Sequence, residues 1–180
     1  MAIHKTHPLS QYLHIKNKKW RKRSCGIICL AMLLGYFNKK RSPDRLLKTG
    51  LKLTFFYKRK KYLAYAPAFG WTHWGLVRLA KKSNLNGAVY DWSTDNDWCK
   101  KSSKKTAFNK VIDLLKKQPV IVSMRKTFNK KGAHLVVLTG YDNKKIFYND
   151  PDHKLQSYSG SHISKTNFLR NWTKRAIVIY

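Results

Sequence analysis

The pattern of hydrophobic and polar residues changes sharply near residue 20. Residues 1–19 are polar and basic and follow no clear period, so we expect an extended lead-in segment there. Residues 24–37 are nonpolar on almost every side, a pattern typical of a buried helix, and Ser24 can cap its N-terminus. The sequence therefore predicts a single domain over residues 20–180, with a hydrophobic helix near its start.

Further helices are expected in the middle of the chain. A Ser-Pro-Asp sequence at 42–44 begins a short helix that Gly50 ends. Residues 51–70 are rich in Tyr, Phe and Lys without a clean period, and we interpret them as a loop or irregular lobe. Helices follow at 76–82 and, with a clear hydrophobic face, at 106–117.

Strands dominate from residue 119 onward. Runs of β-branched and aromatic residues, separated by Gly and Asp-Asn turns, predict strands at 120–124, 134–139, 145–148 and 175–180. A short strand at 87–92 and a helix at 163–172 complete the set. Because helices come first and strands last, the predicted class is α+β with a mainly antiparallel C-terminal sheet.

The net charge is the most unusual feature of the composition. The 180 residues include 38 Lys and Arg but only 8 Asp and Glu, which gives +30 at pH 7. Such a field favours nonspecific contact with nucleic acid or anionic surfaces. The basic residues are scattered, however, which is typical of a solvated surface, so a Lys-rich composition bias is the favoured explanation. Because the chain shows neither a membrane span nor a signal peptide, we expect a cytoplasmic protein; its oligomeric state is not predicted.

The three cysteines indicate thiol chemistry and not disulfide bonds. An odd number without a secretory signal predicts reduced thiols, and the spacing of Cys25, Cys29 and Cys99 matches no zinc motif, so neither a metal nor a cofactor is expected. A cysteine at the start of a helix is acidified by the unpaired N–H groups and the helix dipole. Cys25 has this position, and Gly26 leaves the backbone open to a substrate, whereas Cys29 lies one turn further along, in the core.

His134 and Asp150 are the candidates for a base and for the carboxylate that orients it. His134 starts a hydrophobic strand, and Asp150 follows the end of the next strand. A turn between two antiparallel strands would bring these side chains together, as a Cys–His–Asp arrangement requires. An ordinary strand end followed by an Asp-Pro turn is the alternative. His153 is a rival for the base, although its position in a turn favours solvent exposure.

Four segments, in order, resemble the bacteriocin-processing peptidases that cleave double-glycine leaders, and their small stand-alone bacterial relatives. The segments are Ser-Cys-Gly at 24–26, Leu-Ala-Met at 30–32, the Gly-Ala-His strand ending in Thr-Gly-Tyr at 132–141, and Asn-Asp-Pro at 149–151. The resemblance implies a papain-like (cysteine proteinase) fold with the nucleophile on a central helix. It also implies that Cys25 attacks a carbonyl, that His134 transfers the proton and that Asp150 holds the imidazole.

One position departs from this family. Its members usually carry a Gln six residues before the cysteine, where the amide helps to form the oxyanion hole, and Lys19 occupies that position here. Loss of one oxyanion donor typically costs about 10²–10³ in rate. The Lys19 ammonium and the Trp20 indole N–H are candidate substitutes. Gln11 lies too far back along the chain to fit the usual spacing.

Several glycine and aromatic residues are candidates for the substrate cleft. They are Gly26, Trp71, His73, Trp74, Gly132 and Ala133. The dense Gly-Trp-Thr-His-Trp segment at 70–74 has an equally good alternative, in which Thr72 caps a helix and a tryptophan packs into the core.

The predicted function is that of a cysteine peptidase or amidase that hydrolyses a peptide or peptide-like substrate through a thioester acyl-enzyme. Two alternatives stay open. Lys19 in the oxyanion position favours a catalytically impaired domain that binds peptides. The charge favours, less strongly, a nucleic-acid-binding protein, although the chain contains no helix-turn-helix, zinc-finger or aromatic RNA-binding motif.

Overall fold

The computed structural model describes residues 2–57, 59–95, 100–125 and 134–180. The helices are α1 (Lys18–Arg21), α2 (Cys25–Tyr36), α3 (Pro43–Lys52), α4 (His73–Lys81), α5 (Lys104–Lys117) and α6 (Lys165–Asn171). The strands are β1 (Ala2–Ile3), β2 (Thr54–Tyr57), β3 (Lys60–Leu63), β4 (Tyr65–Ala66), β5 (Gly70–Trp71), β6 (Gly87–Asp91), β7 (Val120–Met124), β8 (His134–Tyr141), β9 (Lys145–Asn149), β10 (Ser161–Ser164) and β11 (Trp172–Ile179).

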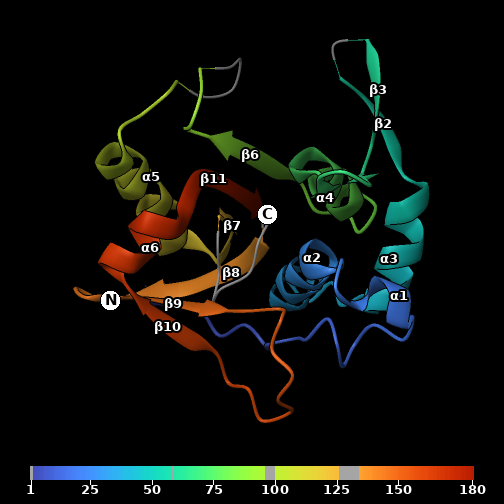
Figure 1. The fold of residues 1–180 in the computed structure, drawn as a ribbon, viewed down its shortest axis with the longest axis horizontal. Helices are drawn as coiled ribbons and strands as arrows, with labels where there is room; N and C mark the ends of the chain where they lie inside the picture. Colours follow the sequence, from blue (N-terminus) through green and yellow to red (C-terminus); the bar gives the residue numbers. More distant parts are fainter. Residues whose placement is uncertain (1, 58, 96–99, 126–133) are drawn as a thin grey trace.

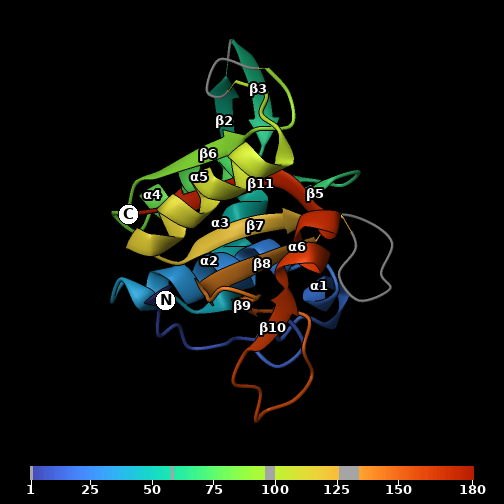
Figure 2. The ribbon, with the colours of Figure 1, turned by 90° about the vertical axis from the view of Figure 1, so that its left-hand side faces the viewer.

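The main sheet has the strand order β10-β9-β8-β7-β11-β6, and β1 pairs with β8 outside this path. Figure 2 shows the strands of the path one above another, from β6 to β10. Within the described residues, all pairings of this sheet are antiparallel. Because β11 lies between β7 and β6, this late strand joins the edge strand β6 to the rest of the sheet.

The central strands of the sheet are buried on both faces. Ile121 and Ile177 belong to the core beneath α2, α3 and α4, whereas their neighbours Val122 and Val178 belong to the core beneath α5 and α6. Successive side chains of a strand point to opposite faces, so a strand that is covered on both faces needs hydrophobic residues at successive positions. This explains why these segments read as continuous hydrophobic runs and not as alternating ones.

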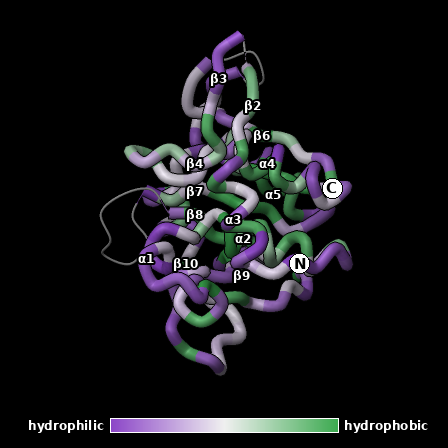
Figure 3. The backbone as a smooth tube through the Cα atoms, turned by 90° about the vertical axis from the view of Figure 1, so that its right-hand side faces the viewer, coloured by the Kyte–Doolittle hydropathy of each residue, from purple (hydrophilic) through white to green (hydrophobic). Residues whose placement is uncertain are grey.

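Helix α2 lies in the middle of the molecule, between the sheet and the helices α3 and α4 (Figures 1 and 3). It contacts β8 on one side and α3 and α4 on others, and all its residues from Gly26 to Leu34 are buried. A helix surrounded in this way has no polar face. The predicted buried helix is therefore confirmed, and the nucleophile candidate lies at its first residue.

The segment predicted as an irregular lobe at 51–70 is different in the structure. It continues α3 to Lys52 and then forms two small antiparallel hairpins, β2–β3 and β4–β5. In β2, Phe55 and Tyr57 are half-buried on one face while Phe56 is exposed on the other. Aromatic residues on both faces hid the period of two that would have predicted a strand.

The predicted lead-in segment packs against the domain. β1 pairs with Gly140 and Tyr141 of β8, and further along Ile15 is fully buried in the core beneath α2. Ser10 and Gln11 are buried as well. The segment escaped prediction because its pairing is only two residues long and its buried residues are isolated in a polar sequence.

The predicted α+β class with a mainly antiparallel sheet is confirmed. The helices and strands expected after residue 72 are present with shifted ends, and β10 is an addition that the sequence did not predict. Across the four described ranges, none of the helices has the length and hydrophobicity that crossing a bilayer requires.

Candidate active site

Cys25 is the first residue of α2, and its side chain is half-buried. Ser24 precedes it at the N-cap position, but its hydroxyl donates to the Trp20 carbonyl at 2.7 Å and makes no capping bond. The N–H groups at the helix start are therefore not occupied by a serine cap. The backbone of Gly26 instead contributes a hydrogen bond to the Cys25 sulfur, which favours the thiolate.

His134 and Asp150 meet because adjacent antiparallel strands run in opposite directions. His134 is the first residue of β8, and Asp150 directly follows β9, whose last residue, Asn149, pairs with Val137. His134 Nε2 lies 2.7 Å from Asp150 Oδ1, and both side chains are largely buried. The predicted pairing of base and carboxylate is therefore present in the structure.

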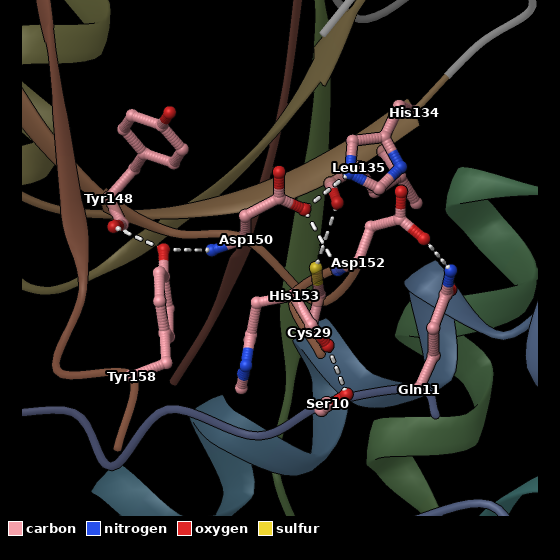
Figure 4. A network of polar contacts seen from close by, with 10 residues as sticks. All are labelled: Ser10, Gln11, Cys29, His134, Leu135, Tyr148, Asp150, Asp152, His153 and Tyr158. Atoms are coloured by element: carbon pink, nitrogen blue, oxygen red, sulfur yellow. Dashed lines mark hydrogen bonds and ion pairs between the residues drawn. The ribbon is translucent and has the colours of Figure 1, made fainter. Parts of the chain in front are cut away.

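The turn after β9 holds the Asp150 carboxylate in place (Figure 4). Asp150 Oδ1 also accepts a hydrogen bond of 2.9 Å from the Asp152 backbone N–H. The Asp150 backbone N–H donates in turn to the Tyr158 hydroxyl at 3.0 Å. Both the side chain and the backbone of Asp150 are thus fixed while the carboxylate faces His134.

The electrostatics of the cluster favour a thiolate–imidazolium pair. Burial raises the pKa of the Cys25 thiol. The hydrogen bond and positive charge of His134, together with backbone hydrogen bonds from Leu135 and Gly26, lower the pKa by more than burial raises it, so it lies below its ordinary value of 9.0. For His134 the effects have the opposite sign: burial lowers the pKa of the imidazole, whereas hydrogen bonds to Asp150 and Cys25 and the negative charges of these groups raise it to about 9. The two shifts are reciprocal, since each charged partner stabilises the other.

Cys29 and His153 do not compete for these roles. Burial raises the pKa of the Cys29 thiol well above 9.0, and its Sγ donates to the Leu135 carbonyl at 3.3 Å. The His153 ring stacks on Tyr158 with centroids 4.0 Å apart, and its Nδ1 contacts the Leu155 carbonyl. Cys99 lies outside the described residues.

A hollow of 590 Å³ opens in front of Cys25. Of the predicted cleft residues, Trp71 and His73 line it, and Leu135, which follows the base, forms part of its wall. Trp74 instead lines a neighbouring hollow of 450 Å³. Gly132 and Ala133 lie outside the described residues.

Gly26 has a packing role and does not open the backbone to a substrate as predicted. It is buried beneath Trp71: a Cβ atom at this position would lie 2.8 Å from Trp71 Cβ and 3.1 Å from Leu76 Cδ1. The Trp71 indole N–H donates to the Arg23 carbonyl at 2.8 Å. The absence of a side chain at residue 26 therefore allows Trp71 to lie against the start of α2. Thr72 caps α4 next to it, so both explanations of this aromatic segment hold in part.

The structure does not place the predicted oxyanion candidates in the cleft. Lys19 is exposed on α1, and neither Lys19 nor Trp20 lines the hollow in front of Cys25. The Trp20 ring packs edge-on against Tyr65, with centroids 4.9 Å apart. The position six residues before the cysteine therefore supplies no side chain to the site.

Gln11, which the sequence spacing excluded, lies beside the carboxylate turn. Its backbone N–H donates to the Pro151 carbonyl at 2.7 Å, and its side-chain amide hydrogen-bonds the Asp152 carboxylate (Figure 4). The side chain is 3% exposed. The residues between Gln11 and Cys25 include α1, so distance along the chain overstates the separation from the site. Gln11 therefore supports the turn that carries Asp150, a role that its position in the sequence does not reveal.

His73 forms a second polar contact at the cleft. Its Nε2 lies 2.8 Å from the Ser123 hydroxyl, and burial together with the nearby Arg175 charge lowers its pKa to about 4. The ring is therefore neutral at physiological pH. Within the described part of the chain, no group of three or more His, Cys, Asp or Glu side chains is suited to hold a metal ion.

The fold and the Cys–His–Asp cluster define the class of papain-like cysteine peptidases. The model of the Peptidase_C39 like family matches residues 4–178, so this chain belongs to that family. The family resemblance and the papain-like fold predicted from the sequence are thus confirmed. The comparison with curated proteins gives no match.

Solved structures share the fold over nearly the whole chain. A double glycine motif protease from an AMS/PCAT transporter, in complex with its leader peptide, has a TM-score of 0.62 and 18% identity, covering 99% of this chain and 93% of that one. A C39-like peptidase from Bacillus anthracis has a TM-score of 0.62 and 20% identity, covering 99% and 96%. The peptidase domain of Streptococcus ComA, a bi-functional ABC transporter involved in quorum sensing, has 0.58 and 25%, covering 88% and 91%.

Proposed function

We propose that this protein hydrolyses a peptide or amide bond, with Cys25 as nucleophile, His134 as acid and base, and Asp150 as the carboxylate that orients His134. One observation carries the proposal: His134 hydrogen-bonds both Asp150 and Cys25, with a raised imidazole pKa and a lowered thiol pKa. Both shifts favour the form with the proton on the imidazole and the negative charge on the sulfur, which is the form that attacks a carbonyl.

The reaction proceeds in two halves. The Cys25 thiolate bonds to the carbonyl carbon, and the His134 imidazolium gives its proton to the departing amine as the C–N bond breaks. Water then attacks the resulting thioester while His134 accepts a proton from it, which releases the free acid and restores the thiolate–imidazolium pair. A peptide is the proposed substrate class, supported by the similar transporter protease that is in complex with a leader peptide.

We include Gln11 in this site as a residue that positions the turn after Asp150, and we leave Lys19 out. The Gln11 side-chain amide donates to the Asp152 carboxylate, and the Asp152 backbone N–H donates to the Asp150 carboxylate. The Lys19 side chain, by contrast, is exposed on α1. A side-chain amide is the donor type that stabilises a developing oxyanion, and the Cys25 backbone N–H is the usual second donor. The Gln11 amide, however, already donates to Asp152 and does not line the hollow in front of Cys25, so we assign Gln11 a positioning role at the carboxylate turn and keep the Cys25 backbone N–H as the oxyanion donor.

Replacement of the nucleophile tests the proposal. Incubation of the wild type with a mixture of peptides, followed by mass spectrometry, should show cleavage that Cys25→Ala abolishes and Cys29→Ala retains. Cys29 is the matched control, since it is a buried thiol on the same helix. Equal melting temperatures of Cys25→Ala and the wild type would show that folding is intact. Cleavage that persists in Cys25→Ala would contradict the proposal.

A peptide-binding domain without hydrolytic activity is the second candidate. Its support is that the side chain of Lys19 does not line the cleft, although the resembling peptidases carry an oxyanion glutamine at this position. The same incubation separates the two functions. Tight binding of a peptide that is recovered unaltered from the wild type would favour the binding domain, whereas fragments that depend on Cys25 would favour the peptidase.

A further inference from the structure

A second hollow adjoins the cleft and is lined mainly by aromatic side chains. It has a volume of 450 Å³, and its aromatic residues are Phe55, Tyr57, Tyr62 and Trp74. Thr72, His73 and Arg175 line both this hollow and the one in front of Cys25. The two hollows therefore border each other at these three residues.

The hairpin β2–β3 shapes this hollow. Phe55 stacks on Tyr62 across the hairpin, with ring centroids 5.8 Å apart and planes inclined by 21°. Tyr57 lies on the same face of β2 as Phe55, so both rings face the hollow, whereas Phe56 points away and is 68% exposed. A concave, largely apolar surface with a few polar groups at its margin is typical of a ligand site.

Exposed hydrophobic residues gather around the same hairpins. Tyr62, Leu63 and Phe69 are 40%, 48% and 86% exposed, in addition to Phe56. Phe69 lines the cleft in front of Cys25. Single exposed hydrophobic residues are common on protein surfaces, but a cluster of them beside a cleft is typical of a binding surface.

The charges around both hollows select an anionic ligand. Lys22, Arg23 and Arg175 line the cleft, and its described lining contains no Asp or Glu. Asp91, which lines the aromatic hollow, is ion-paired with Arg175 at 2.8 Å and accepts a hydrogen bond from Ser93. The net charge of +30 adds attraction at longer range.

At the junction between the hollows, the charge of Arg175 is balanced by its ion pair with Asp91. His73 is neutral near pH 7, because burial and the Arg175 charge hold its pKa at about 4. A neutral imidazole leaves the entrance to the aromatic hollow open to an apolar side chain, while Lys22 and Arg23 at the cleft are exposed and can meet a carboxylate.

We propose that the aromatic hollow is a side-chain subsite of the active-site cleft, and that its ligand is an aromatic residue within an acidic peptide. The inference rests on the proposed function, since it assigns the substrate class of the same site. The apolar wall binds the aromatic ring, and the basic rim binds neighbouring Asp or Glu side chains.

Binding to the Cys25→Ala variant tests the subsite independently of hydrolysis. The probes are fluorescein-labelled peptides of Glu, Gly and Ala that carry a single Phe at successive positions, and fluorescence anisotropy gives their Kd values. We expect the Phe peptide to bind about tenfold more tightly than its Ala counterpart at one position. Replacing Glu by Gln should weaken binding, and this loss should shrink as salt is raised.

Matched variants assign the effect to the hollow. In the Cys25→Ala background, Tyr57→Ala removes part of the aromatic wall, whereas Phe56→Ala changes the opposite face of the same strand. Thr94→Trp fills the hollow from an exposed residue of its lining and leaves the hairpin intact. We expect Tyr57→Ala and Thr94→Trp to abolish the Phe preference and Phe56→Ala to retain it. Lys22→Gln, at an exposed basic residue of the cleft, should reduce the Glu preference.

Three results would overturn the inference. They are equal binding of the Phe and Ala peptides, a Phe preference that survives Thr94→Trp, and a single-stranded oligonucleotide of equal charge that binds as tightly as the acidic Phe peptide. Failure of the proposed function looks different: Cys25→Ala and the wild type would then both show the Phe preference without any cleavage. Conversely, cleavage by the wild type with no preference for Phe or Glu would retain the peptidase and reject the subsite.

Discussion

His134 and Asp150 are separated by a whole β-hairpin in sequence but by 2.7 Å between Nε2 and Oδ1 in space. The hairpin β8–β9 produces this contact, because its two open ends carry the base and the carboxylate. The contact leaves the other ring nitrogen of His134 for Cys25, with which the imidazole also shares a hydrogen bond. The arrangement has measurable consequences for pH dependence, reactivity and stability.

The pH profile of kcat/KM should be bell-shaped. The acid limb reflects loss of the Cys25 proton, whose pKa is lowered, and the alkaline limb reflects loss of the His134 proton at a pKa of about 9. Asp150→Asn removes a negative charge that raises the His134 pKa, so the alkaline limb should move toward the ordinary value of 6.5. Asp142→Asn, at the closed end of the same hairpin, is the control and should leave both limbs in place. An unchanged alkaline limb in Asp150→Asn would contradict the assignment.

The two thiols of α2 should differ strongly in reactivity. Cys25 is half-buried with a lowered pKa, whereas Cys29 is fully buried with a raised one. In a Cys99→Ser background, iodoacetamide at pH 7 should alkylate Cys25 and leave Cys29 unmodified until the protein is denatured. Peptide mapping by mass spectrometry gives the ratio. Comparable labelling of both residues in the folded protein would disprove an activated thiolate at Cys25.

Two glycines of α2 should respond in opposite directions to alanine. Gly26→Ala places a Cβ 2.8 Å from Trp71 Cβ, so we expect a loss of about 1–3 kcal/mol in the free energy of unfolding. A Cβ at Gly35 meets nothing within 4 Å, so Gly35→Ala should gain up to about 1 kcal/mol from its helix propensity. Urea denaturation measures both. Equal effects of the two substitutions would show that the Trp71 contact does not require glycine.

Gln11 and Lys19 can be separated by their effect on turnover. Gln11→Ala removes the buried amide that holds Asp152 beside Asp150, so we expect kcat to fall by about 10–100-fold. Lys19→Ala should leave kcat unchanged, because this side chain is exposed on α1 and does not line the cleft. Steady-state kinetics on a cleaved peptide, with melting temperatures as a check on folding, distinguish the two. The reverse pattern would restore Lys19 as the donor.

Features that depend on local pattern could be predicted from the sequence. The nonpolar stretch that starts at Ser24 predicted α2, and the β-branched runs predicted β7, β8 and β9. Once two successive strands were expected, an antiparallel turn sufficed to place His134 beside Asp150. These predictions succeeded because side-chain period and strand direction alone determine them.

Features that depend on packing between distant segments could not be predicted. The role of Gly26 depends on Trp71, which comes from a hairpin that the sequence did not reveal. Gln11 reaches the Asp150 turn because residues 2–15 fold back along the domain, so its distance from Cys25 along the chain was misleading. In both cases the deciding contact joins segments with no periodic relation to each other.

The position of β11 has a consequence for how the chain folds during synthesis. Among the residues that the structure describes, β6 pairs in the main sheet with β11 alone, and β7 pairs with the same strand along one of its edges. Until β11 has emerged from the ribosome, β6 lacks this partner and β7 exposes the edge that β11 later covers. We expect the nascent protein to remain prone to edge-to-edge association up to that moment, and the cleft wall at Arg175 to form last.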